Sequence, residues 1–262
     1  MKKIISILLT ITLLPTVLCA YAEEPAANTA IRYEGPGFDT PEDAVTCYLN
    51  GLKNQDIEQM LSAFAWETQA SHYAVDKSLR SIGVYSQSTA VRMPAINDFM
   101  VSANLHSLRA LTVRMIYNAL EAYILGDDCP NGDAVPMKDD ADVEVFLKKF
   151  DNGQLEKLTE MSEITFLTPD FVTNNRFSSE KNKERLISMT EQYGADELVN
   201  VVATALIGKG IILCMPTVAR YGDRWYIVSV SSVTSSLLGV DANRQAFIWL
   251  GEGLKELNDL FI

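Results

Sequence analysis

The residues best suited to chemistry gather around His72, in the stretch WETQASHYAVD. An imidazole paired with a carboxylate can act as a general acid or base near neutral pH. The candidate catalytic residues are therefore His72 with Glu67 and Asp76, and the candidate ligand-binding residues are Trp66 and Tyr73. The alternative interpretation is a surface or half-buried histidine without a chemical role.

The rest of the chain lacks the local motifs of common enzyme classes. His106 falls inside an expected helix and has no acidic neighbour at helical spacing. No GxSxG elbow, P-loop or GxGxxG pattern occurs, and the serines near the carboxyl end read as strand and turn residues. These absences favour a non-catalytic protein, although an acid–base site needs no local motif.

An acidic stretch after residue 126 invites a calcium interpretation. It fits part of the EF-hand template from Asp127, but Lys138 then occupies position twelve, where the template needs a bidentate Glu. A solvated acidic loop is the simpler interpretation, and a looser site on Asp139, Asp140 and Asp142 stays open as the alternative. We predict no bound metal and no cofactor.

The amino terminus has the pattern of a secretory signal peptide. Lys2 and Lys3 precede an uncharged run over 4–18, and Ala20-Tyr21-Ala22 supplies a small-x-small cleavage site. We expect cleavage after Ala22 and a secreted or extracytoplasmic protein. A membrane anchor would need an apolar run of about 20 residues, and lipidation at Cys19 is the other alternative.

The mature chain would be strongly acidic. Residues 1–22 contain two Lys and no Asp or Glu, so removing them changes the net charge from −12 to −14. The electrostatic field of a chain with this negative charge repels nucleic acid and anionic lipid. We expect no nucleic-acid partner, and a small molecule, a peptide or a cell-wall component as ligand.

Three cysteines would remain after cleavage: Cys47, Cys129 and Cys214. They allow one disulfide at most, and we expect a Cys47–Cys214 bridge if any forms. The chain has no CxxC pair and no Cys/His spacing typical of zinc sites.

The first two thirds of the chain read as mostly helical. After a polar linker at 23–34, Thr40, Pro41 and Asp43 mark the start of a helix, and a second short helix follows from Ile57 to Ala65. Residues 67–96 are poorly periodic. Three further helical stretches are then expected, at 97–126, at 143–160 with a break at DNG, and at 178–194. One or two strands are expected over 163–172, before the last of these helices.

The chain changes character after Asp196. Residues 197–232 are rich in β-branched side chains and contain two glycine turns, which predicts a meander of about three strands. A membrane helix over 198–217 is disfavoured by Lys209 near its centre. From Asp241 we expect an amphipathic terminal helix, whose apolar seam over 241–262 would dock on the sheet or form a homodimer.

Two stretches resemble the nuclear transport factor 2-like, or cystatin-like cone, superfamily. TPEDAVTCYLNGLKNQDIEQMLSAFA is similar to its opening helical pair, and TVARYGDRWYIVSVSS is similar to its last hairpin with a Trp-bearing strand. The resemblance covers residues 40–65 and 217–232. It implies a single α+β domain over 35–262, with a curved antiparallel sheet around the helices and a large helical insertion at about 70–195.

Members of this superfamily include enzymes, binding modules and non-catalytic secreted domains, so the resemblance implies no single function. We expect a secreted, non-catalytic binding or interaction domain. The alternative is a cone-type hydrolase, isomerase or dehydratase that uses His72 with a nearby carboxylate. In the second case His72 and an acid would converge in a concave site, and in the first the cavity would exclude His72.

Overall fold

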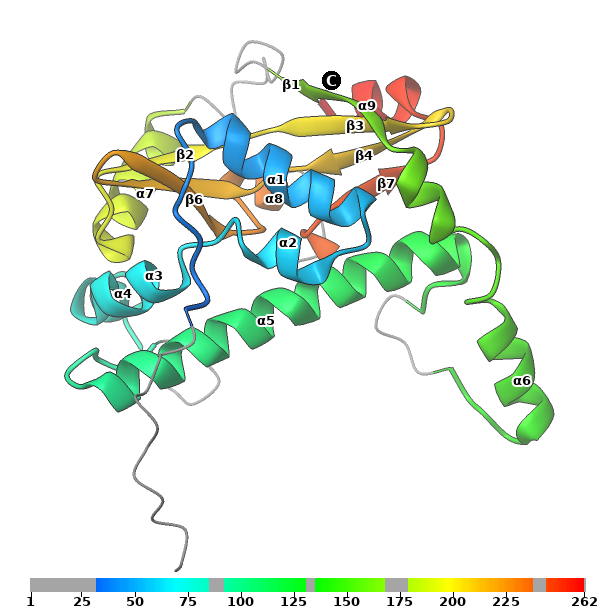
Figure 1. Ribbon diagram of the computed structural model, residues 1–262, viewed down its shortest axis with the longest axis horizontal. Coiled ribbons are helices and arrows are strands. Elements are labelled where there is room, and N and C mark those ends of the chain that lie inside the picture. The colour runs from blue at the N-terminus through cyan, green and yellow to red at the C-terminus, as the bar shows by residue number, and fades with distance from the viewer. Residues whose placement is uncertain (1–31, 85–91, 131–134, 168–178, 238–243, 262) are drawn as a thin grey trace, which may run out of the picture. The chain divides into compact units, whose positions relative to one another are not determined.

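The computed structural model describes residues 32–84, 92–130, 135–167, 179–237 and 244–261 (Figure 1). By the pattern of contacts between its residues, the chain divides into Met1–Arg32 and one compact unit, Tyr33–Ile262. The expected signal peptide at 1–22 and most of the linker at 23–34 lie outside the described residues. In the part of the chain that is described, no helix combines the length and the apolarity needed to cross a membrane.

The compact unit is α+β, as the sequence predicts. Its helices are α1 (Pro41–Lys53), α2 (Ile57–Leu61), α3 (Trp66–His72), α4 (Val75–Ile82), α5 (Asp98–Leu125), η1 (Gly126–Asp128), α6 (Asp140–Lys148), η2 (Glu156–Glu160), α7 (Glu180–Tyr193), α8 (Val233–Leu237) and α9 (Leu254–Phe261). Its strands are β1 (Ser162–Phe166), β2 (Glu197–Asn200), β3 (Ala203–Ile207), β4 (Gly210–Cys214), β5 (Thr217–Tyr221), β6 (Arg224–Ser229) and β7 (Ile248–Leu250).

The predicted meander is present and is bent in the middle. β2–β3 and β4–β5 form one long hairpin, with a single register from the Glu197–Arg220 pair to the Ile207–Gly210 pair. The ladder breaks at Val201 and Pro216, where one bond from Val201 N to Pro216 O (3.1 Å) remains. Because proline has no N–H to donate, it interrupts the ladder and permits the bend.

Two strands, β6 and β7, lie one after the other along the edge of the hairpin formed by β4 and β5. β6 pairs antiparallel with β5, and β7 pairs antiparallel with β4, so both lie along the same side of the hairpin. Between β6 and β7 the chain forms α8, and residues 238–243 after it lie outside the described residues. The other side of the hairpin is bordered by β1, which pairs with β3.

The helix pair α1–α2 packs on one face of this sheet. Thr40 caps α1 by accepting a bond from Asp43 N (3.1 Å), as expected. The buried face of α1 joins Phe64 and Ile227 in the largest hydrophobic cluster. A Cβ on Gly51 would lie 2.5 Å from Met60 N, so glycine permits the close approach of α1 to α2.

The opposite face is covered by two different helices. Tyr226 and Val228 of β6 pack with Leu186 and Met189 of α7, within the expected insertion. Farther along the sheet, Leu257 of α9 packs on Ile211 and neighbouring residues of β4. β6 is therefore covered on both sides, with Ile227 on one face and Tyr226 and Val228 on the other.

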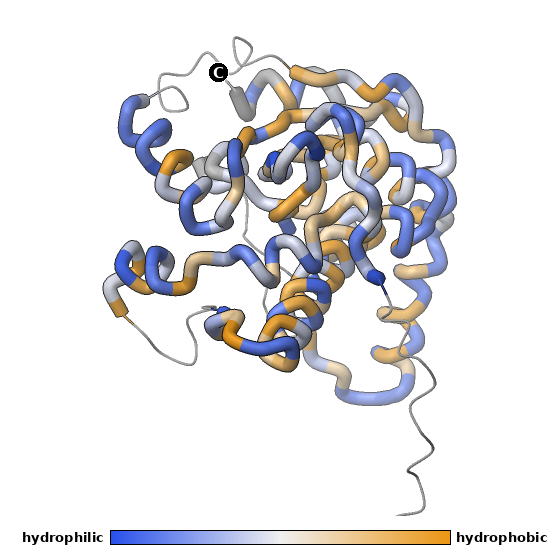
Figure 2. Tube along the Cα trace, turned by 60° about the vertical axis from the view of Figure 1, so that its left-hand side comes forward, coloured by the Kyte–Doolittle hydropathy of each residue, from blue (hydrophilic) through white to orange (hydrophobic). Residues whose placement is uncertain are grey.

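The long helix α5 agrees with its predicted bounds. Asn97 accepts a bond from Met100 N (2.9 Å) at its start, and Gly126 follows its last residue. Ile116, Ala119 and Tyr123 face the main cluster. Hydrophobic residues lie along α5 as well as along the strands (Figure 2).

Three expectations are corrected. The terminal helix does not begin at Asp241: residues 241–243 lie outside the described residues, and 248–250 form β7 because that run pairs with β4. The poorly periodic residues 67–96 contain α3 and α4. The Cys47–Cys214 bridge is wrong, since both are free thiols: Cys47 lies near Gln59 O, whereas Cys214 lies near Ala246 O.

Candidate functional site

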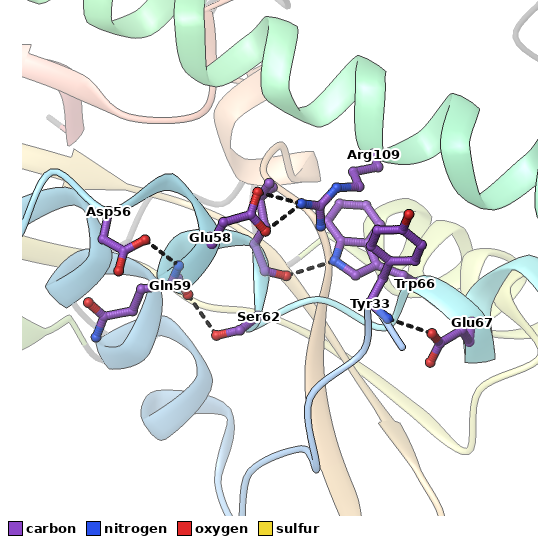
Figure 3. A network of polar contacts seen from close by, with 9 residues as sticks. Tyr33, Asp56, Glu58, Gln59, Ser62, Trp66, Glu67 and Arg109 are labelled. Atoms are coloured by element: carbon purple, nitrogen blue, oxygen red, sulfur yellow. Dashed lines mark hydrogen bonds and ion pairs between the residues drawn. The ribbon is translucent and has the colours of Figure 1, made fainter. Parts of the chain in front are cut away.

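Two of the sequence candidates take part in a structural network where α2, α3 and α5 meet (Figure 3). Trp66 is 1% exposed and donates its indole N–H to Leu61 O (2.7 Å). Glu67 accepts a bond from Tyr33 N (2.7 Å). Both side chains are thus engaged in holding the chain segments together.

His72 lies at the end of α3 and is exposed. Its Nδ1 is 2.8 Å from Thr68 O, and its ring centroid is 6.1 Å from that of Tyr221. Asp76 is exposed on α4. Within the described ranges, no hydrogen bond or ion pair joins Asp76 to His72.

Tyr73 belongs to an aromatic cluster around a half-buried arginine, Arg92. The Arg92 guanidinium lies 3.9 Å from the Tyr73 ring centroid and 5.5 Å from that of Tyr193. Burial lowers the pKa of Arg92 and raises the pKa of both Tyr193 and Tyr221. Tyr73 donates its hydroxyl to Ser78 (2.8 Å), and Tyr221 donates to Tyr193 O (3.0 Å), so the cluster joins α3–α4 to α7 and β5.

A cavity of about 590 Å³ lies elsewhere, beside the carboxyl-terminal end of α5. Its lining comes from α5, from β7 and from the segments that flank β7: Ala119, Ala122, Tyr123, Gly126, Arg244, Phe247, Ile248, Trp249, Gly251, Glu252 and Glu256. Its size falls within the range of small-molecule pockets. None of the sequence candidates lines it.

Aromatic side chains make up one wall of this cavity. The Tyr123 ring meets Trp249 edge-on, with centroids 5.3 Å apart, and meets Phe247 at 6.4 Å. Trp249 lies directly over Gly210 of β4, because a Cβ built on Gly210 would come 2.0 Å from the indole ring. Gly210 therefore provides the space that fixes the indole position.

The Tyr123 hydroxyl is buried and has no hydrogen-bond partner among the described residues. Burial raises the pKa of Tyr123 to about 12, and the negative charge of Glu160 adds to the shift. A buried hydroxyl without a partner is destabilising by about 1–3 kcal/mol. A protein that keeps such a hydroxyl loses some folding stability. Unpartnered buried polar groups of this kind are typical of functional sites.

The cavity also carries charged groups. Arg244 donates one N–H to Cys129 Sγ (2.9 Å) and makes no ion pair within the described part of the chain. Glu256 accepts a bond from Glu252 N (3.1 Å), and Glu252 pairs with Lys255 (2.6 Å) at the surface. Arg244 thus retains donors for an anionic or hydrogen-bond-accepting group.

Sequence reasoning missed this site because it assigned the terminal run to a helix. The run AFIWL before Gly251 is also a short apolar strand followed by a turn, and that interpretation would have drawn attention to Trp249. Arg244 and Tyr123 gave no local signal, since they reach the cavity from distant segments.

Within the described ranges, no group of three or more His, Cys, Asp or Glu side chains could hold a metal ion. Part of the stretch compared with the EF-hand template, residues 131–134, lies outside the described residues. At the start of α6, the Asp139 carboxylate accepts a bond from Asp142 N, and the Asp142 carboxylate accepts one from Lys138 N (both 3.0 Å).

No family profile and no curated protein matches the chain. Among solved structures, it is similar to the crystal structure of a cystatin-like protein from Ruminococcus gnavus, with 17% sequence identity and a TM-score of 0.40. The match covers 73% of this chain and 40% of that chain, so this chain spans less than half of that protein's length. The similarity is a weak one at the level of the fold and carries no argument about function.

Proposed function

We propose that this chain is an extracytoplasmic, non-catalytic domain that binds a small molecule or the end of a larger one in the cavity beside α5. The observation that carries the proposal is the cavity itself, where an aromatic wall meets an arginine that has no ion pair among the described residues. A concave, partly apolar site with a few polar groups is the usual form of a ligand pocket.

The lining indicates the chemistry of the ligand. A ring or apolar moiety would pack on Trp249 and Phe247, and an anionic or hydrogen-bond-accepting group would bind Arg244. The carboxylates of Glu252 and Glu256 border the same space and would oppose a second negative charge. We therefore expect a compact ligand with one acidic or acceptor group.

The extracytoplasmic part of the proposal depends on the amino-terminal sequence. The signal-peptide pattern predicts that the protein isolated from its own host begins at Glu23, and an intact-mass measurement would establish this. A mature chain that retains residues 1–22, or that carries a lipid at Cys19, would contradict it.

The binding proposal is tested by native mass spectrometry of the processed protein purified from its own host, followed by titration of the released compound. We expect one ligand per chain, with Trp249 fluorescence changing on binding. Arg244→Ala should weaken binding about tenfold or more, because a charge-assisted hydrogen bond is lost. Arg80→Ala, an exposed arginine on α4, is the matched control.

His72→Ala separates the proposal from the enzyme alternative. Since His72 does not line the cavity, this variant should bind the ligand as tightly as the unaltered protein. The proposal is wrong if no ligand is retained and if Arg244→Ala and Arg80→Ala behave alike toward every compound tried.

A further inference from the structure

Two unpartnered helical surfaces in this chain complement each other. We infer that the protein self-associates head to tail, with α6 of one copy lying in a groove on α5 of the next copy. This inference is independent of the ligand cavity, and it concerns a surface different from the 241–262 seam considered above.

The first surface lies on α5, beside Tyr33 and α2. A groove of about 530 Å³ is lined there by His106, Arg109, Ala110, Val113, Arg114 and Tyr117. Leu111 and Tyr117 beside it are 54% and 51% exposed. The groove is thus an apolar strip with basic edges.

The charge of this strip is unlike that of the rest of the chain. No acidic residue occurs between Asp98 and Glu121, although the chain has 34 Asp and Glu against 22 Lys and Arg. Arg109 is paired with Glu58 of α2, but Arg114 contacts only the Tyr117 ring, at 5.2 Å, among the described residues. Arg114 is therefore an exposed cation available to an acidic partner.

The second surface is α6. This helix of nine residues has no buried residue, and only Phe146 among them is even half-buried. Helices shorter than about 12–15 residues are marginal in water unless they pack against something. Packing against another surface would give α6 the stability that its own contacts do not.

The residues of α6 form an acid-flanked apolar face. Val143, Phe146 and Leu147 recur at helical spacing, and Leu147 is 59% exposed. Asp140 and Glu144 border this face, and neither makes an ion pair among the described residues. Asp139 and Asp142 cap the start of α6, so Glu144 is not needed as a cap. Its carboxylate is therefore available to a basic partner.

A second copy fits the groove better than the other candidates do. One contact would cover both surfaces, placing the apolar face of α6 on the Ala110–Tyr117 strip and Glu144 beside Arg114. The nine residues of α6 are about 13 Å long, and the 106–117 groove spans a similar length of helix. An anionic membrane, the alternative for a basic apolar strip, would leave the acid-flanked apolar face of α6 uncovered.

The contact joins different surfaces on the two copies, so it produces rings or open chains. The test is sedimentation velocity on the processed full chain, from low micromolar to submillimolar concentration. We expect a concentration-dependent series of species. A protein that stays monomeric throughout would overturn the inference, whether or not it binds vesicles of anionic phospholipid.

Two substitutions on the same helix locate the surface. Leu147→Asp places a charge in the apolar face and should abolish association. Val145→Asp, 61% exposed on the other side of α6, should leave it within about twofold. Equal effects of the two variants would contradict the proposed orientation.

Charge reversal supplies a check that misfolding cannot imitate. Arg114→Glu and Glu144→Arg should each weaken association about tenfold or more, because like charges then meet. The double variant in one chain, or an equimolar mixture of the two single variants, should regain most of the affinity. Arg185→Glu, an exposed position on α7, is the control, and failure of the double variant to recover would overturn the pairing.

Discussion

The α1–α2 pair and the α5–α6 pair differ in how much of their apolar surface is buried within the chain. α1 buries its apolar face completely against the sheet, and its polar ends are capped. α5 buries only one side, and α6 has no fully buried residue. The first region therefore explains the fold, and the second contains surface that the fold does not use.

The same contrast separates the two candidate sites. The network around Trp66 and Glu67 has its bonding needs met, as a structural region should. Among the described residues, the cavity beside α5 has an arginine without an ion pair, and the hydroxyl of its lining residue Tyr123 has no hydrogen-bond partner. Arg92 Nη1 beside Tyr73 also lacks a hydrogen-bond partner among the described residues, so the cavity, rather than an unmet polar group alone, distinguishes the functional candidate.

The largest expected effect lies in the α1–α2 region. Phe64 is 2% exposed and stacks on Trp66 with centroids 4.8 Å apart. Phe64→Ala should lower the free energy of unfolding by about 3–5 kcal/mol, because a cavity forms in the main cluster. Denaturant titration measures it, and a loss below about 1 kcal/mol would mean that this region is not the stable part of the molecule.

The next effect lies at the boundary between the sheet and the cavity. Gly210→Ala would place a methyl group where the Trp249 indole now lies. We expect a destabilisation of about 1–3 kcal/mol from overpacking, together with a shift in Trp fluorescence. Unchanged fluorescence and unchanged ligand binding would show that Gly210 does not set the indole position.

A smaller effect of opposite sign is expected at Tyr123. Tyr123→Phe removes the unpartnered hydroxyl, so the ligand-free protein should become more stable by about 1 kcal/mol while its ligand affinity falls. Thermal unfolding with and without ligand measures both. A ligand-free variant less stable than the unaltered protein would reveal a partner for the hydroxyl.

The pKa of Tyr123 adds a dependence on pH. Its folded-state pKa of about 12 lies above the usual value of 10.0, because burial favours the neutral phenol. The unfolded chain therefore loses this proton first, so the stabilisation is complete below about pH 10 and is lost as the pH rises toward 12. Stability measured between pH 9 and 11.5 should fall less steeply in Tyr123→Phe, and identical slopes would contradict the assignment.

The smallest effect is expected on α6. Leu147→Ala should change the free energy of unfolding by less than about 0.5 kcal/mol in dilute solution, because Leu147 is exposed within one chain. At high concentration the same variant should associate more weakly. A large loss of stability in dilute solution would show that α6 packs within its own chain.

The sequence by itself determined the local elements that carry strong end signals. Thr40 and Asn97 cap their helices as predicted, and Gly126 and Gly194 follow the last residues of α5 and α7. The glycine turns of the meander also determined its hairpins. Each of these features depends on side chain–backbone bonds or on backbone geometry within a few residues, and such interactions can be recognised in the sequence.

Only the tertiary structure decided what the terminal run and the site would be. AFIWL has no local preference strong enough to select strand over helix, and its pairing with β4 made it β7. Tyr123, Arg244 and Trp249 meet because the chain leaves the sheet after β6 and returns beside β4. Contacts between residues so distant in the chain depend on how the elements pack, and no local pattern records that packing.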